Sequence, residues 1–158
     1  MNRYAWFAGL VLAADQLSKY WVTHVIKLWR GPRDLAPFLS LTWVENRGIS
    51  MGLLDLGDSG RWVLVALTAA IALVVAWWLA REENAADSLA LAAILGGAVG
   101  NIIDRVRLGF VVDFVHLHVG ARSFYVFNVA DAAITLGVAA LLARGLIKRE
   151  QPTRSHAE

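Results

Sequence analysis

The feature that most limits how this chain can fold is a set of long apolar segments. One of them, WVLVALTAAIALVVAWWLA, starts at Trp62, carries no charge and has tryptophans near both ends. A helix needs about 20 mostly apolar residues to cross the bilayer core, and tryptophan is enriched at both membrane interfaces. We therefore expect a transmembrane helix at about residues 62–79.

Three further apolar segments approach this length, at about residues 4–25, 88–103 and 127–146. The chain of 158 residues is 58% apolar and 18% charged, whereas a soluble domain is usually about half apolar and a quarter charged. The first segment holds Asp15 and Lys19 and precedes further spans, so it does not read as a cleavable signal peptide. The sequence predicts a single integral-membrane domain over residues 1–158, an all-α membrane protein with four transmembrane helices.

Two inserts between these spans lie on the same side of the expected membrane, at about residues 26–61 and 108–125. The first contains FLSLTWVENRG, rich in β-branched and aromatic residues, and the second contains the alternating FVVDFVHLHV. Both patterns indicate short strands, and we expect a small β-rich insert between the first two spans. The polar tail at about residues 148–158 is expected to be disordered.

An even number of spans puts both termini on one side of the membrane. The dense basic tail favours the cytoplasm for that side. The bias is small, because basic residues are equally numerous on both sides. One side has Arg3, Arg81, Arg144, Lys148, Arg149 and Arg154, and the other has Lys27, Arg30, Arg33, Arg47, Arg61 and Arg122.

The composition also excludes several classes of function. There is no cysteine, which rules out disulfides, thiol nucleophiles and thiolate metal sites. The four histidines show no HxxxH or HExxH spacing, so we expect no zinc site and no cofactor. The net charge is only +2, and no basic stripe alternates with aromatic residues, so no nucleic-acid partner is expected.

Charged side chains inside the expected spans call for an explanation, since each costs at least about 2.5–3.5 kcal/mol at the bilayer centre. Asp15 and Lys19 are spaced i, i+4 and could neutralise one another, or Lys19 could extend to the interface. In the third segment Asn101 and Asp104 are spaced i, i+3, beside a GxxxG pattern that allows close helix packing. Each feature taken alone is compatible with a purely structural role.

Two further acids, Asp113 and Asp131, have no lysine or arginine three or four residues away. Two carboxylates brought together share a proton, because both cannot ionise cheaply. The ionised acid can then take a proton from water, while the protonated acid donates to a scissile carbonyl. This pattern indicates an aspartic-peptidase dyad, although proton relays and structural networks also use paired membrane acids.

Four blocks of this sequence resemble the lipoprotein signal peptidase (signal peptidase II) family. They are DQLSK at Asp15–Lys19, ENRG at Glu45–Gly48, GGAVGNIIDRVRLGFVVDF at Gly96–Phe114 and FNVADAAI at Phe127–Ile134. The blocks occur in the family's order and extend over nearly the whole chain. The resemblance implies an intramembrane aspartic endopeptidase that cuts prolipoproteins just before a diacylglyceryl-modified cysteine.

The same resemblance implies roles for individual residues. Asp113 and Asp131 fall on the catalytic pair. The positions that shape or support the site are matched by Asp15, Lys19, Asn46, Gly48, Asn101, Asp104, Arg105, Asn128 and Ala130. No metal or cofactor is implied. The partners would be the prolipoprotein signal peptide with its diacylglyceryl-cysteine and membrane lipid, and the enzyme would be a monomer.

The family also implies a location, the bacterial inner membrane, with both termini cytoplasmic and the active site toward the periplasm. Its first periplasmic insert forms a small sheet on the membrane surface. This chain departs from the family in ISMG after ENRG, where Met51 replaces the usual phenylalanine. We expect altered packing there, with Ile49, Met51 and Leu53 forming an apolar wall for the substrate.

Two rival functions remain open from the residues alone. A small proton-coupled membrane transporter component would use Asp15, Asp104 and Asp131 as a relay, but the sequence has no inverted repeat. A non-enzymatic scaffold would use the same acids only to hold helices together. Loss of cleavage in folded Asp113→Asn and Asp131→Asn variants would separate a peptidase from both.

Overall fold

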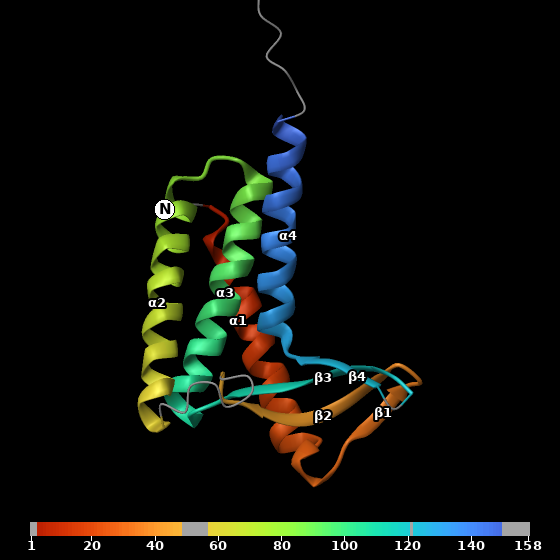
Figure 1. The fold of residues 1–158 in the computed structure, drawn as a ribbon. Helices are drawn as coiled ribbons and strands as arrows, with labels where there is room; N and C mark the ends of the chain where they lie inside the picture. Colours follow the sequence, from red (N-terminus) through yellow and green to blue (C-terminus); the bar gives the residue numbers. More distant parts are fainter. Residues whose placement is uncertain (1–2, 49–56, 121, 150–158) are drawn as a thin grey trace, which may run out of the picture.

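Four helices form a bundle, and a small sheet extends sideways from one end of it (Figure 1). The structure is a computed structural model that describes residues 3–48, 57–120 and 122–149. The long helices are α1 (Ala5–Tyr20), α2 (Gly57–Arg81), α3 (Ala85–Leu108) and α4 (Val129–Arg149). A π-helical turn, η1 (Trp21–Val25), continues α1, and a 3-10 turn, η2 (Leu28–Arg30), follows it. The expected apolar wall at residues 49, 51 and 53, and most of the expected tail, lie outside the described residues.

Three helices in the described part of the chain are long and apolar enough to cross a membrane. They cover Gly60–Arg81, Ala85–Leu108 and Val129–Ile147. Helix α1 has 16 residues, which is shorter by itself than a membrane span requires. The second, third and fourth predicted spans are therefore present as membrane-capable helices, while the predicted first span is divided between α1 and η1.

Helix α3 occupies the centre of the bundle and is longer than the sequence predicted. Asn84 starts it, since its side-chain oxygen accepts hydrogen bonds from the backbone of Ala86 (3.0 Å) and Asp87 (3.2 Å), as an N-cap does. Gly109, at φ +88°, ends it. Residues 104–108, which the sequence placed beyond the span, thus belong to the last turn of α3.

Glycines bring the backbones of the bundle helices close together. A Cβ at Gly96 would collide with the carbonyl oxygen of Ala8 in α1, and one at Gly97 would lie 2.6 Å from that of Ala130 in α4. From the other side, a Cβ at Gly137 would lie 2.7 Å from the carbonyl oxygen of Ala90. Close approach of α1 and α4 to α3 thus depends on residues without a side chain.

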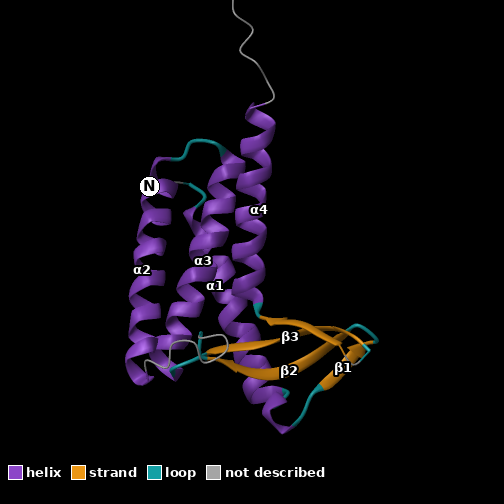
Figure 2. Cartoon of the chain, viewed as in Figure 1, coloured by secondary structure: helices purple, strands orange, loops and turns teal. Residues whose placement is uncertain are grey.

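The sheet has four antiparallel strands in the order β1-β2-β3-β4 (Figure 2). They are β1 (Arg33–Ala36), β2 (Leu39–Asn46), β3 (Val111–Val119) and β4 (Arg122–Phe127). The expected β-rich insert between the first two spans is present as β1 and β2. The strands predicted in the second insert are present as well, and the structure joins both inserts in one sheet, half of which comes from residues 111–127. A lone two-stranded hairpin is marginally stable, and pairing β2 with β3 extends it.

The alternation of side chains along β3 separates a core from a polar site. Val112 and Phe114 are buried in a cluster with Val22 and Leu28 from the end of α1 and the turn after it. Successive side chains in a strand point to opposite faces, so Asp113 points away from this cluster. Strand β3 thereby presents a carboxylate to the end of the helix bundle.

Candidate active site

Asp131 lies in the first turn of α4, where it takes part in a capping box. The side-chain oxygen of Asn128 accepts a hydrogen bond from the backbone N–H of Asp131 at 2.9 Å, and the Asp131 carboxylate accepts one from the backbone N–H of Asn128 at 3.3 Å. Reciprocal bonds of this kind satisfy the free N–H groups of a helix start. The helix dipole also favours a negative charge there. The local sequence thus fixes the orientation of Asp131.

Asp113 reaches the same place from β3 and is 2% exposed. Its carboxylate accepts hydrogen bonds from the side-chain amides of Asn46 on β2 (2.9 Å) and Asn128 (2.6 Å). Asn46 is itself held by a 2.8 Å hydrogen bond from the backbone N–H of Gly48. Gly48 has φ +79°, a conformation that favours glycine, which explains the Asn-x-Gly spacing in ENRG.

One side chain, that of Asn128, therefore joins the two aspartates. Its amide nitrogen donates to Asp113, and its oxygen accepts from the backbone of Asp131. Asn128 is fully buried. The two carboxylates that the sequence singled out, 18 residues apart, are thus held in one hydrogen-bonded unit.

Burial is the main influence on the Asp113 carboxyl and raises its pKa above the ordinary value. The hydrogen bond from Asn46 opposes this rise, and the negative charge of Asp131 adds to it. The hydrogen bond from Asn128 and the charge of Lys19 oppose it further. The net effect of these influences is that the pKa of the Asp113 carboxyl stays above its ordinary value.

A buried lysine organises the charges behind the dyad. The ammonium of Lys19 lies 2.8 Å from a carboxylate oxygen of Asp15 and 2.8 Å from one of Asp104. It also donates to the side-chain oxygen of Asn101 at 3.1 Å, and Asn101 donates through its amide to Asp131 at 2.9 Å. Of the two arrangements that the sequence left open for Lys19, the structure has the pair with Asp15, together with a second acid that the spacing did not reveal.

Asp15 connects this charge cluster to the start of α4. Its second carboxylate oxygen accepts a hydrogen bond from the backbone N–H of Ala130 at 3.0 Å, and Asp15 is fully buried. Asp104 similarly accepts from the backbone N–H of Val112 on β3 at 3.3 Å. Asp15 thus holds the start of α4, which carries Asp131, and Asp104 holds the start of β3, which carries Asp113.

Gln16 belongs to the site, although the sequence reasoning did not select it. Its side-chain amide lies 3.1 Å from Asp15, 3.1 Å from Asp104 and 3.3 Å from the carbonyl oxygen of Gly100. The sequence did offer one indication of this role. Gln16 lies within the DQLSK block, three residues before Lys19, and residues three apart are neighbours on a helix surface. Its contacts to α3 could not be read from that spacing.

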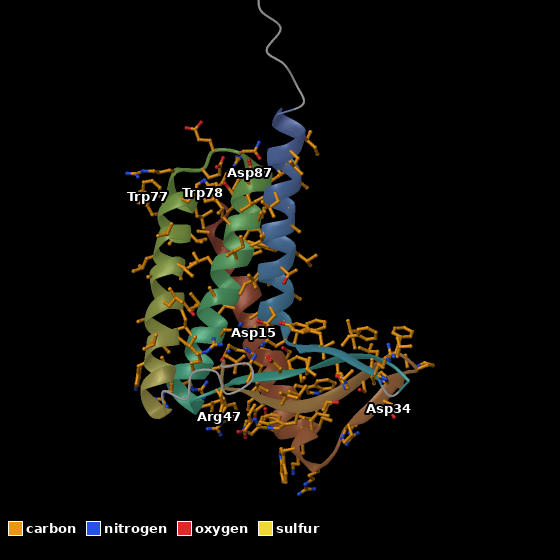
Figure 3. All side chains as sticks on the ribbon, viewed as in Figure 1. Asp15, Asp34, Arg47, Trp77, Trp78 and Asp87 are labelled. Atoms are coloured by element: carbon orange, nitrogen blue, oxygen red, sulfur yellow. The ribbon has the colours of Figure 1, made fainter. Side chains whose placement is uncertain are left out.

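Arg105 and Gly48 lie at the edge of the site. A Cβ at Gly48 would lie 3.5 Å from a terminal nitrogen of Arg105, so the turn after β2 passes beside the guanidinium group. The Nε of Arg105 is buried and has no hydrogen-bond partner within the described residues. All eleven residues that the resemblance assigned to the site are described, and they gather where the helices meet the sheet. Figure 3 labels Asp15 there, with Asp34 far away along the sheet.

A mostly apolar cavity of about 310 Å³ opens beside Asp131. It is lined by Tyr125, Phe127, Asp131, Ala132, Thr135 and Leu136. Ligand sites typically combine an apolar wall with a few placed polar groups. Within the ranges that the structure describes, no group of three histidine, aspartate or glutamate side chains is placed to hold a metal ion.

Comparison with known families decides the class of this site. Residues 7–147 match the family described as "Signal peptidase (SPase) II". The chain belongs to the signal peptidase II family. It is therefore a peptidase by family, and the resemblance carried by the four sequence blocks is confirmed.

Relatives and solved structures of similar proteins agree with this membership. A lipoprotein signal peptidase of Sphingopyxis alaskensis is 48% identical over 155 residues, covering 96% of this chain and 90% of the relative. One of Rhizorhabdus wittichii is 50% identical over 146 residues, covering 90% and 85%. A bacterial membrane enzyme solved by the in meso method superposes with a TM-score of 0.81 at 26% identity, covering 98% of this chain and 94% of that one. That structure is described as a membrane enzyme, and the membrane-capable helices in the described part of this chain agree with the likeness.

Proposed function

We propose that the chain is an intramembrane aspartic endopeptidase that removes signal peptides from prolipoproteins, cutting before the diacylglyceryl-modified cysteine. Family membership supports the peptidase activity and the prolipoprotein substrate. The observation that carries the aspartic mechanism is Asn128, which joins Asp113 and Asp131 in one hydrogen-bonded unit. The same family match argues against the proton-coupled transporter that the sequence alone left open.

The chemistry needs only the two carboxyls and water. The ionised acid takes a proton from water as the water oxygen bonds to the scissile carbonyl carbon, and the protonated acid donates to the carbonyl oxygen. Collapse of the tetrahedral intermediate breaks the C–N bond, and the leaving amine takes a proton from the dyad. Two coupled acids titrate as a pair, and the raised pKa of Asp113 helps to keep one proton on that pair.

The surrounding polar residues hold the dyad in place. Asn46 and Asn128 donate to Asp113, and Asn101 donates to Asp131. Hydrogen bonds of this kind hold the two carboxyls in a defined orientation before the substrate binds, which favours reaction by positioning. Lys19 balances two buried acids and also bonds to Asn101, so it positions Asp131 through an intermediate residue.

The placement in the membrane follows from α1. Taken together, α1 and η1 cover residues 5–25, and at about 1.5 Å per residue they reach about 30 Å, the thickness of the bilayer core. The charges of Asp15 and Lys19 are buried within the bundle, so they face protein and not lipid. We therefore assign α1 with η1 as the first of four spans.

Four spans put both termini on one side, and Figure 1 places the start of α1 and the end of α4 at the bundle end opposite the sheet. We assign that end to the cytoplasm and the sheet, with the dyad, to the periplasmic side of the bacterial inner membrane. The basic end of the chain supports this orientation. The scissile bond would then lie where water can reach it.

The cavity beside Asp131 is the proposed entry for the substrate. Phe127 and Leu136 give the cavity an apolar lining. This lining suits a signal peptide or the acyl chains of the lipidated cysteine, because closely packed apolar atoms attract one another by dispersion. We propose a monomer that needs no metal or cofactor, with membrane lipid as its surroundings.

The test is cleavage of a diacylglyceryl-modified prolipoprotein by purified enzyme in detergent, without added metal. Wild type is compared with Asp113→Asn, Asp131→Asn and the control Asp34→Asn, which changes an exposed acid on β1. We expect wild type and Asp34→Asn to cut before the modified cysteine and the two dyad variants to lose at least about 10³-fold in rate.

The folded state of each variant is checked by thermal unfolding in the same detergent. Full activity of both dyad variants would overturn the aspartic mechanism while leaving the family intact. Absence of cleavage by folded wild type would overturn the proposed substrate.

A further inference from the structure

We propose that His116 and His118 on β3 form a binding site for a divalent transition-metal ion, separate from the active site. The sequence predicted no zinc site, because these histidines lack the HxxxH and HExxH spacings of helical metal sites. On a strand the relevant period is two residues. The HLH sequence at residues 116–118 therefore places both imidazoles on one face of the sheet.

The structure supports this placement in detail. Strand β3 keeps its alternation through this region, because the irregular pairing with β4 skips Phe124 and not a residue of β3. The two imidazole rings lie with their centroids 5.1 Å apart and their planes tilted by 43°. The opposite face of β3 carries Asp113, so the two sites face different ways.

The spacing of the rings suits a shared metal ion. A histidine nitrogen binds Zn²⁺ at about 2.0–2.1 Å, and the ring centre lies about 1.1 Å farther, so the metal is about 3.2 Å from each centroid. Two imidazoles at a tetrahedral angle then have centroids about 5.2 Å apart. The observed 5.1 Å is close to this value, so the two rings already have the spacing that a shared ion requires.

The Nε2 atom of one ring has no hydrogen-bond partner within the described residues, and that of the other has a hydroxyl partner whose hydrogen bond a metal ion would replace. The Nε2 of His118 is buried and has no hydrogen-bond partner within the described residues, which is costly for a buried polar atom. The Nε2 of His116 lies 2.7 Å from the hydroxyl of Ser123, and Ser123 is the cross-strand partner of His118. The Ser123 hydroxyl thus lies beside the His116 ring, where it would serve as a further oxygen ligand of a bound metal ion.

The surroundings are polar and have room for an ion with bound water. A cavity of about 330 Å³ is lined by Asp34, Ser40, Thr42, His116, His118 and Ser123, together with Pro32 and Gly120. The Nδ1 of His116 lies 3.3 Å from the Ser40 hydroxyl and 3.4 Å from that of Thr42. These contacts hold the ring, as outer partners of metal-binding histidines do.

The ligand set determines the kind of ion. No group of three histidine, aspartate or glutamate side chains in the described residues is placed to hold a metal ion, so the proposed site consists of two imidazoles completed by hydroxyl oxygen or water. Imidazole suits Cu²⁺, Ni²⁺ and Zn²⁺, whereas Mg²⁺ and Ca²⁺ prefer oxygen ligands. Cu²⁺ should bind most tightly, as the general order of divalent affinities requires.

The test uses the full chain in detergent, purified without a histidine tag, in a buffer that does not chelate metals. All proteins carry His156→Gln, which removes the histidine in the tail. Calorimetric titration with CuCl₂ and with ZnCl₂ is compared for this background, for His118→Gln, for His116→Gln and for the control His24→Gln on η1. We expect one ion per chain, at least tenfold weaker binding after either β3 substitution, and unchanged binding in the control.

Electron paramagnetic resonance of the Cu²⁺-loaded background protein provides a second measurement that needs no β3 variant. We expect superhyperfine structure from two imidazole nitrogens. Binding that survives the His116→Gln, His118→Gln double variant, or a spectrum with fewer than two nitrogens, would overturn the proposal. The cleavage assay that tests the proposed function is run without added metal. Its result therefore does not depend on any of these metal-binding outcomes.

Discussion

Replacing Gly100 by alanine tests how closely α3 must approach the buried acid of α1. A Cβ at this position would lie 2.5 Å from a carboxylate oxygen of Asp15 and 3.2 Å from its carboxyl carbon, whereas ordinary contact begins at 3.4 Å. The carboxylate would have to retreat by about 0.9 Å. It has little freedom to do so, because Lys19 and the backbone of Ala130 hold it at 2.8 and 3.0 Å.

The cost follows from these contacts. Overpacking in a filled interior costs about 1–3 kcal/mol, and weakening a hydrogen bond to a buried charge costs about 1.5–3 kcal/mol. Alanine has a better helix propensity than glycine, and this difference stabilises the variant by up to about 1 kcal/mol. We expect Gly100→Ala to destabilise the protein by about 2–4 kcal/mol, a fall in Tm on the order of 10 °C.

The matched control is Gly145→Ala in α4, where an added Cβ meets nothing within 4 Å. This variant should unfold at the same temperature as wild type or slightly above it, and should cleave normally. Gly100→Ala should also lose cleavage, since Asp15 holds the first turn of α4, which carries Asp131. The two variants are compared by thermal unfolding and prolipoprotein cleavage in detergent. Equal Tm values and equal rates in the two would refute the reasoning.

Three other substitutions test separate parts of the structure. Because burial raises the pKa of Asp113, its contribution to stability is present at low pH and is lost as the pH rises through that raised pKa; Asp113→Asn should therefore have a higher Tm than wild type at neutral pH, and the difference should shrink on acidification. A lower Tm at neutral pH would contradict the burial argument. Asn128→Ser keeps an N-cap oxygen but loses the amide that reaches Asp113, so we expect a Tm within a few degrees of wild type and a large loss of cleavage rate; unchanged cleavage would remove Asn128 from the site. Arg144→Gln removes the partner that donates to Asp87 at 2.5 Å and should lower stability by about 1–3 kcal/mol while leaving the rate per folded molecule unchanged, and a selective loss of rate would contradict a purely structural role.

The sheet shows how the active site and the proposed metal site share one scaffold. Asp113 and His116 lie three residues apart on β3, and alternation sends them to opposite faces. Asp113 meets Asn128 and Asn46 at the end of the bundle, while His116 contacts hydroxyl groups in the neighbouring strands. An ion bound at the second face by the histidines and Ser123 would join β3 to β4, and would thus stiffen the strand that carries the proposed catalytic acid.

The sequence determined the features of this protein that depend on neighbouring residues. Three of the membrane-capable helices follow from apolar runs, since crossing a bilayer is a matter of length and composition. The i, i+4 spacing allowed a pair between Asp15 and Lys19 but did not decide it. The four blocks also identified the family, because their order and residue types are together specific to it.

Only the tertiary structure decided which distant groups meet. The sequence located strands in both inserts but not their union into one sheet, because strand pairing depends on where the helices bring the two segments. The bond from Asn128 to Asp113, the contacts of Gln16 with α3 and the second partner of Lys19 at Asp104 all join segments that are far apart in the chain. Spacing along a helix or strand specifies a face, whereas a contact between elements also depends on how their backbones pack, and here glycines of α3 set that distance.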